Sequence, residues 1–212
     1  MQINLHHSKT AAANLAQIVL NLCIDVVLIQ EPYAFSAPNP VLAEVPPGFT
    51  AFHDLSKDHA YGAAILVRDS VRYGGSIATK HYGNFAACID LKSKFGTFRF
   101  ASLYLRPSLP DFASTVSQCF ALFSSPTAVL GVDCNAKNQL WNSSHTDHKG
   151  LEFEQSVLSN KLNIMNVAID ALAFVPGGTA FVDVTLAGDA INVSRWLFLP
   201  FASMSDHFIC LL

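Results

Sequence analysis

The sequence predicts an α/β fold in which sheets form the centre and helices lie outside. Apolar runs of strand length alternate along the chain with longer stretches whose apolar residues recur at helical spacing. The composition is 51% hydrophobic and only 14% charged, which indicates a large buried core. The 212 residues suit a single domain over residues 1–212, because no repeat, low-complexity tract or linker divides them.

The first half of the chain predicts one helix and several strands. The helix is expected over residues 8–22, where apolar side chains share one face behind a capping Ser8 or Thr10. The second strand is apolar throughout, which suits a sheet covered on both faces, and a proline-rich loop follows it. The strands are expected over residues 2–5, 25–29, 63–67, 86–91 and 97–105.

The second half predicts two helices and a β-rich end. The helices are expected over residues 111–123 and 149–162, with a strand over residues 127–133 between them. Three further strands are expected over residues 181–186, 193–199 and 207–212.

Composition excludes several classes of protein. No apolar run approaches the roughly 18 residues of a membrane span, and the first residues lack the order of a signal peptide. The net charge of −3 counts against a strong nonspecific polyanion binder, although a locally basic groove stays open. Five scattered cysteines without a CxxC motif predict reduced thiols in an intracellular protein, not disulfides or a zinc site: Cys23, Cys88, Cys119, Cys134 and Cys210.

The stretch GVDCNAKNQLW, residues 131–141, ends an apolar run in polar groups. Asp133 and Asn135 are two residues apart, so their side chains leave the same face of an extended chain. A carboxylate and a carboxamide side by side could hold a metal, a water or a phosphate. They could equally form an ordinary Asx turn.

Polar or ionisable side chains stand at the ends of the other strands as well. Glu31 could be a solvated loop acid, Asp183 a turn acid and Asp206 an N-cap. Tyr104 could be a core aromatic and His207 a structural hydrogen-bond partner. Strand ends converge in α/β proteins, however. One shared ligand site therefore explains all of these side chains together, whereas the alternatives need a separate reason for each. The side chains are Asn4, Glu31, Tyr104, Arg106, Asp183, Asp206 and His207.

These motifs, in this order, resemble the motif set of the exonuclease–endonuclease–phosphatase family. More narrowly, they are similar to the endonuclease domain of non-LTR (LINE-type) retrotransposons, and the site-specific branch is nearest. The resemblance covers residues 2–212 and implies a four-layer α/β sandwich, with two mostly antiparallel sheets face to face between helices. Cys134 stands where the family usually has an aromatic residue, and we expect it to point into the core. The motifs of the narrower resemblance are Gly131–Trp141, Val182–Leu186, Ser194–Trp196 and Ser205–His207.

The resemblance implies a metal site for phosphodiester cleavage. Hard carboxylate and amide oxygens without cysteine suit Mg²⁺, for which Mn²⁺ could substitute. Glu31 is the main ligand that the resemblance implies, with Asn4 and Asp206 as further ligands.

The resemblance also implies the catalytic groups. Asn135 and Tyr104 would donate hydrogen bonds to phosphate oxygens. Asp183 would orient His207, and Asp133 would activate water. Whether Asp133 or His207 is the general base stays open, since His207 could instead contact phosphate as an imidazolium.

The implied function is an endonuclease that nicks one strand of double-stranded DNA in the nucleus. The resulting 3′-hydroxyl would prime reverse transcription by a reverse transcriptase domain of the same, larger polyprotein. Two alternatives stay open. One is an apurinic-site repair nuclease or phosphomonoesterase of the same fold. The other is a catalytically silent nucleic-acid-binding module.

DNA contacts are expected near the site motifs. Residues 174–181 predict a hairpin with Gly177 and Gly178 at its tip, and in the resembled endonucleases a hairpin at this position probes the DNA groove. This hairpin carries no Lys or Arg, so cations elsewhere must meet the phosphates, unless they are only solvated surface charges. The candidate cations are Arg106, Lys137 and Arg195.

Overall fold

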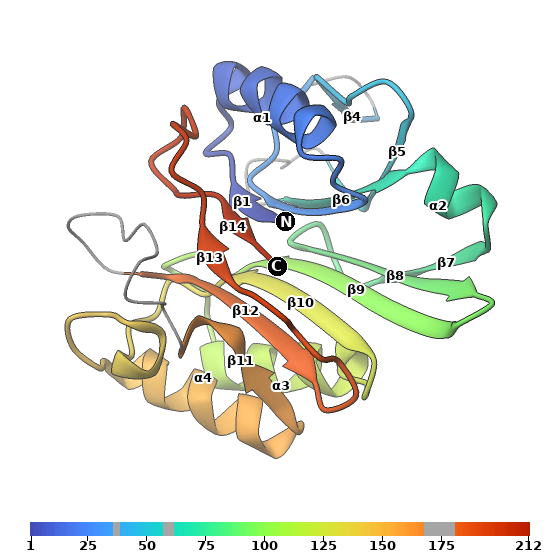
Figure 1. The fold of residues 1–212 in the computed structure, drawn as a ribbon. Coiled ribbons are helices and arrows are strands. Elements are labelled where there is room, and N and C mark those ends of the chain that lie inside the picture. Colours follow the sequence, from blue (N-terminus) through green and yellow to red (C-terminus); the bar gives the residue numbers. More distant parts are fainter. Residues whose placement is uncertain (36–38, 57–61, 168–180) are drawn as a thin grey trace.

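The computed structural model describes residues 1–35, 39–56, 62–167 and 181–212, and its centre is a pair of six-stranded sheets packed face to face (Figure 1). The first sheet has the order β13 (Leu197–Phe198), β14 (Cys210–Leu211), β1 (Gln2–Asn4), β2 (Val26–Gln30), β6 (Ala63–Arg68) and β5 (Phe49–His53). The second has the order β11 (Leu162–Ile164), β12 (Asp183–Gly188), β10 (Ala128–Asp133), β9 (Gly96–Tyr104), β8 (Ala86–Ser93) and β7 (Ser76–His81).

Most paired strands run antiparallel, as expected. Within the described ranges, the parallel pairs are β1 with β2 and β9 with β10. A small separate ribbon is formed by β3 (Ala34–Phe35) and β4 (Val41–Leu42), inside the segment that the sequence interpretation treated as a proline-rich loop.

Helices cover the outer faces of both sheets (Figure 1). Leu15 and Val19 of α1 pack on the first sheet, and Phe120 of α3 and Phe153 of α4 pack on the second. A third apolar cluster, which includes Leu28, lies where residues of both sheets meet. The four-layer sandwich is therefore confirmed. The helices are α1 (Lys9–Asn21), α2 (Asp69–Tyr73), α3 (Phe112–Phe123) and α4 (His148–Ser159), with short 3-10 turns at Gln139–Trp141 and Met165–Val167.

Local sequence explains where the helices begin and end. The Ser8 hydroxyl caps α1 by accepting a 3.1 Å hydrogen bond from the backbone of Ala11. The Asp147 carboxylate caps α4 in the same way. The expected helix over residues 149–162 was too long at its C-terminal end, because Lys161 turns into the left-handed region (φ 53°) and strand β11 follows.

The two sheets touch closely beneath the ends of their central strands. A side chain at Gly131 would come within 3.0 Å of Gln2 and Leu28 of the other sheet, so glycine allows this approach. Polar groups meet here as well, since Thr185 donates to Gln2 across the interface at 2.8 Å. Paired buried polar groups of this kind fix how the sheets align. The alignment brings the ends of β1, β2, β10 and β12 together.

Every helix in the described ranges is too short or too polar to cross a lipid bilayer. All five cysteines are free thiols, and Cys134 is buried in the core as expected.

Candidate active site

Three site residues lie in one row across the second sheet. Asp133 ends β10, and the strand register places it beside Tyr104 of β9 and beside Asp183 of β12. Neighbouring strands lie less than 5 Å apart in general, so the three side chains share one end of the sheet. Asp133 is only 1% exposed, which places a carboxyl group deep inside this end of the sandwich.

The first sheet contributes a second pair of residues. The Asn4 side-chain nitrogen donates to Glu31 Oε2 at 3.0 Å and to Asp133 Oδ2 at 2.7 Å. Asn4 Oδ1 accepts a 2.7 Å hydrogen bond from the backbone of His6, which fixes the orientation of the amide. One carboxamide therefore joins an acid from each sheet.

His207 completes the cluster from the segment before β14. Its Nδ1 donates to Asp183 Oδ2 at 2.7 Å, and its Nε2 lies 4.0 Å from Asp133 Oδ2 and 3.8 Å from Asp206 Oδ1. Burial opposes the charged imidazolium, but the neighbouring carboxylates, Asp183 foremost, outweigh it and raise the pKa of His207 to about 9. The ring therefore carries a proton on each nitrogen at neutral pH.

The surroundings of Asp133 favour the neutral form of its carboxyl group. Burial and the nearby negative charge of Asp183 disfavour its ionisation and raise its pKa to about 7. The charge of His207 and the hydrogen bond from Asn4 offset only part of this effect. Asp133 can therefore gain or lose a proton near neutral pH, which is the property that a general base or acid requires.

Glu31 is held as an anion. Burial favours its neutral form, but hydrogen bonds from His7, Asn4 and Tyr104 outweigh burial and keep the pKa of Glu31 below its usual value. Its backbone lies in the left-handed region (φ 45°), which is costly for a residue with a side chain and is often found at functional sites.

The sequence interpretation did not include His7 in the site. His7 Nε2 lies 3.1 Å from Glu31 Oε1, and its Nδ1 lies 3.3 Å from the Pro32 carbonyl oxygen. The ring thus ties the side chain of Glu31 to the backbone that follows it. The pair of histidines at positions 6 and 7, which follows Asn4 closely in the sequence, could have pointed to this contact.

The cluster offers hard donor atoms to a metal ion. Among the described residues, Asp133, Asp183 and His207 form a group of metal-ligand type, with ligand atoms within 4.8 Å of one another. Glu31 adds carboxylate oxygens beside them, whereas Asn4 turns its amide nitrogen toward Glu31 and Asp133 and its oxygen toward the backbone of His6. The thiol of Cys134 donates to the carbonyl of Val182 at 3.1 Å and is not part of the group of metal-ligand type. Oxygen donors without thiolate fit Mg²⁺ or Mn²⁺.

The other predicted site residues lie at different distances from this cluster. The Asn135 side chain donates to the carbonyl of Leu105 at 3.2 Å, and its backbone N–H donates to Asp133. The Asp206 side chain is 60% exposed and pairs with His6 at 3.2 Å.

Two of the candidate DNA-binding cations, Arg106 and Lys137, are half-buried near the ends of β9 and β10. The expected hairpin with Gly177 and Gly178 lies outside the described residues.

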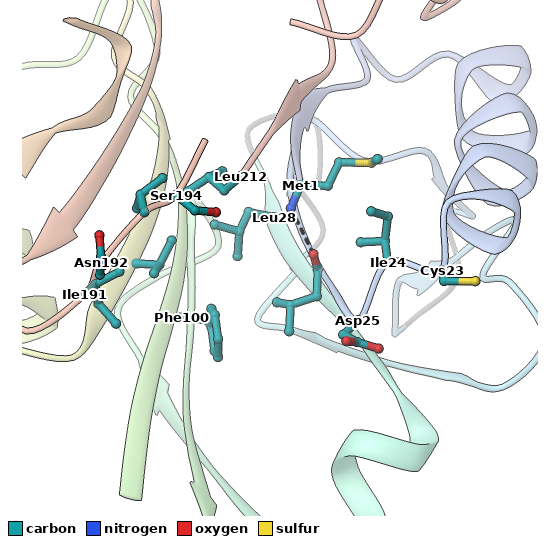
Figure 2. Close-up of a pocket in the computed structure, with 13 residues that line it drawn as sticks. Met1, Cys23, Ile24, Asp25, Leu28, Phe100, Ile191, Asn192, Ser194 and Leu212 are labelled. Atoms are coloured by element: carbon teal, nitrogen blue, oxygen red, sulfur yellow. Dashed lines mark hydrogen bonds between the residues drawn. The ribbon is translucent and has the colours of Figure 1, made fainter. Parts of the chain in front are cut away.

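Arg195 is exposed on the segment that precedes β13. Its neighbour Ser194 lines a pocket of about 430 Å³ between the sheets, together with Met1 and Val26 (Figure 2). Met1 and Val26 lie at the starts of β1 and β2, whereas Asn4 and Glu31 lie at the other ends of these strands. The pocket is therefore separate from the polar cluster, and most of its lining is apolar.

The profile of a protein family described as endonuclease–reverse transcriptase matches residues 98–211. This match spans more than half of the chain, including the motifs at Asp133, Asp183 and His207. The chain belongs to the endonuclease–reverse transcriptase family.

Solved structures share the fold of this family member. The endonuclease domain of TRAS1, a telomere-specific non-LTR retrotransposon, is 23% identical, with a TM-score of 0.75 over 98% of this chain and 93% of that one. A mannosyl-6-phosphatase of Bacteroides thetaiotaomicron is 16% identical, with a TM-score of 0.63 over 96% and 91%. TDP2 of D. rerio, solved with a single-strand DNA product, is 10% identical, with a TM-score of 0.55 over 98% and 94%. The comparison with curated proteins gave no match.

Proposed function

We propose that this protein is a Mg²⁺-dependent endonuclease that nicks one strand of double-stranded DNA and leaves a 3′-hydroxyl and a 5′-phosphate. The observation that carries the proposal is the cluster in which His207 is fixed by Asp183 and faces the buried carboxyl group of Asp133. In a larger polyprotein, a reverse transcriptase domain would extend the 3′-hydroxyl in the nucleus. The family description, which joins an endonuclease to a reverse transcriptase, supports this partner.

The proton chemistry follows from the two shifted pKa values. Asp133, with a pKa of about 7, takes a proton from the attacking water. His207, with a pKa of about 9, stays an imidazolium and donates a hydrogen bond to a phosphate oxygen, where negative charge gathers in the transition state. Asp183 keeps the ring of His207 in place through the 2.7 Å contact.

Glu31, Asn4 and Asp206 are the proposed metal ligands. A divalent ion held there supplies positive charge against the phosphate and the leaving 3′ oxygen. The imidazolium of His207 has no free lone pair and therefore cannot bind the ion. The carboxylates are the better ligands. Glu31 suits this role because its hydrogen bonds keep it ionised.

Neutral donors and nearby cations complete the proposal. The amide of Asn135, through its second hydrogen, and the hydroxyl of Tyr104, in exchange for its bond to Glu31, would donate to phosphate oxygens of the bound strand. Arg106 and Lys137 contact flanking phosphates, because both follow strands that end at the cluster.

The test is conversion of supercoiled plasmid to the open-circular form, with Mg²⁺ and with EDTA. We expect nicking by the wild-type protein with Mg²⁺ only. Asp133→Ala and His207→Ala should each lower the rate about 100-fold or more. His148→Ala is the matched control, since this side chain is 85% exposed on α4 and should leave the rate unchanged.

Near-wild-type nicking by either site variant would contradict the proposal. Release of inorganic phosphate from 3′-phosphorylated oligonucleotides, without plasmid nicking, would favour the phosphomonoesterase alternative. The fold shared with a mannosyl-6-phosphatase makes this comparison necessary.

A further inference from the structure

The segment between β13 and β14 displays two large apolar side chains beside the catalytic cluster. Phe201 is 48% exposed and Met204 is 54% exposed, and Met204 precedes His207 by three residues. Figure 1 shows this segment, drawn in red, projecting beside the start of α1. The segment that carries these two exposed side chains therefore runs from the start of α1 to the candidate active site.

Hydrogen bonds hold the backbone of this segment in place. The Asn14 side chain of α1 donates to the carbonyl of Ala202 at 2.8 Å, and the Ser8 hydroxyl donates to the carbonyl of Met204 at 3.3 Å. Ser205 donates to the carbonyl of Asn4 at 2.9 Å, which ties the segment to the site itself. The apolar side chains are thus presented on an anchored support.

The backbone of Met204 shows that the anchoring overrides local preference. Its φ of 59° lies in the left-handed region, which residues with a side chain avoid. Such a conformation persists only where the surroundings impose it. The bond from Asn14 to the Ala202 carbonyl before Met204 and the bond from Ser205 to Asn4 after it hold the backbone on either side.

A DNA substrate at the cluster would lie against these two side chains, since the same segment supplies Asp206 and His207. The chain has 13 Lys and Arg against 16 Asp and Glu, so its overall attraction to phosphates is weak, and a contact with the bases would add to the binding that Arg106 and Lys137 supply. Bases offer apolar faces to aromatic side chains, and apolar wedges enter between base steps in bent DNA.

We propose that Phe201 and Met204 form an apolar wedge that contacts nucleobases beside the cleaved phosphate, an inference that rests on the proposed nicking of DNA. The wedge makes cleavage favour steps that unstack easily, such as pyrimidine–purine steps. Because it is uncharged, it also supplies binding that salt does not weaken.

The test uses a DNA duplex that carries 2-aminopurine, a base whose fluorescence rises on unstacking, within pyrimidine–purine steps. Binding is measured in EDTA, and nicking is measured separately with Mg²⁺. The variants are the double change Phe201→Ala with Met204→Ala, and the conservative double change Phe201→Trp with Met204→Leu. Phe95→Ala is the matched control, because Phe95 is 78% exposed in the turn between β8 and β9.

We expect the wild-type protein to raise the fluorescence and the double-alanine variant to leave it unchanged. The same variant should nick paired duplex about 10-fold to 100-fold more slowly, and nick a duplex with a mismatch at the cleaved step nearly as fast as wild type. The conservative pair and the Phe95 control should behave as wild type.

Wild-type fluorescence and duplex nicking in the double-alanine variant would overturn the wedge and leave the proposed nuclease intact, provided that the wild-type protein nicks plasmid. A wild-type protein that neither nicks plasmid nor alters the fluorescence would overturn both. Both side chains are half exposed, so the thermal unfolding midpoint should stay close to wild type, and this measurement confirms that the variants are folded.

Discussion

Asn4 donates a 2.7 Å hydrogen bond to Asp133, and this contact joins the end of β1 in one sheet to the end of β10 in the other. The same nitrogen donates to Glu31, so one amide separates two acids that would otherwise repel each other. The proposed metal ligand and the proposed general base are thereby held at a fixed spacing. Proton transfer and metal binding can then act on one phosphate.

The pH dependence of nicking distinguishes the two candidates for the general base. A base works only when deprotonated, so Asp133 predicts a rate that rises and levels off near pH 7, from its pKa of about 7. An imidazolium role for His207 predicts a fall near pH 9, from its pKa of about 9. We expect this bell shape in kcat/KM. A rate that keeps rising through pH 9 would make His207 the base instead.

Asp133→Asn should abolish nicking and yet stabilise the protein above neutral pH. The folded pKa of Asp133 is about 7, above its unfolded value of about 3.9. The folded state therefore binds more protons between these values, and stability falls as the pH rises through that window. The variant lacks this penalty. Its unfolding midpoint should exceed that of wild type at pH 8 and converge with it near pH 4.

Equal midpoints of Asp133→Asn and wild type at pH 8 would show that the buried charge costs little in the folded state. Circular dichroism at both pH values makes the comparison, with Asp111→Asn as a control on the protein surface.

Glu31→Gln should raise the Mg²⁺ concentration needed for half-maximal nicking by about tenfold or more. The amide keeps an oxygen donor but loses the charge that attracts the ion. Glu44→Gln, at an exposed acid outside the site, is the control and should leave the Mg²⁺ dependence unchanged. EDTA should stop nicking without shifting the unfolding midpoint, because the ion serves catalysis and not folding. Full activity in EDTA would refute the role of Glu31.

Arg106→Ala and Lys137→Ala should each flatten the dependence of log binding constant on log salt concentration by about one unit, for any DNA sequence. Arg195→Ala should leave the slope unchanged, because its neighbour Ser194 lines the pocket at the opposite end of the sandwich. Binding isotherms at several salt concentrations give the slopes. An unchanged slope for Arg106 and Lys137 would place the DNA-binding surface elsewhere.

The sequence predicted the central strands well because their signals are local and strong. The run before Asp133 is apolar, and strand β10 ends at that residue. The motif order also indicated which strand ends to group, and the structure brings Asn4, Glu31, Asp133, Asp183 and His207 together. The catalytic roles of these residues remain predictions.

Edge strands and backbone conformations were harder to predict. Ser76–His81 forms β7 at a sheet edge, where most of its side chains are exposed and no apolar pattern marks the strand. The contact of His7 with Glu31 occurs with a left-handed backbone at both residues. The residue types do not indicate this conformation. Similarly, the exposed positions of Phe201 and Met204 depend on hydrogen bonds from α1, far away in the sequence.

The most direct test of the proposed function is the chemistry of the nick. Plasmid treated with the protein and Mg²⁺ is given DNA polymerase and labelled nucleotides, without prior phosphatase treatment. We expect label at the nicks made by the wild-type protein, since a polymerase extends only a free 3′-hydroxyl. With His207→Ala we expect no label. Nicks that accept label only after removal of a 3′-phosphate would contradict the proposed priming role, and an absence of nicks would contradict the proposed endonuclease.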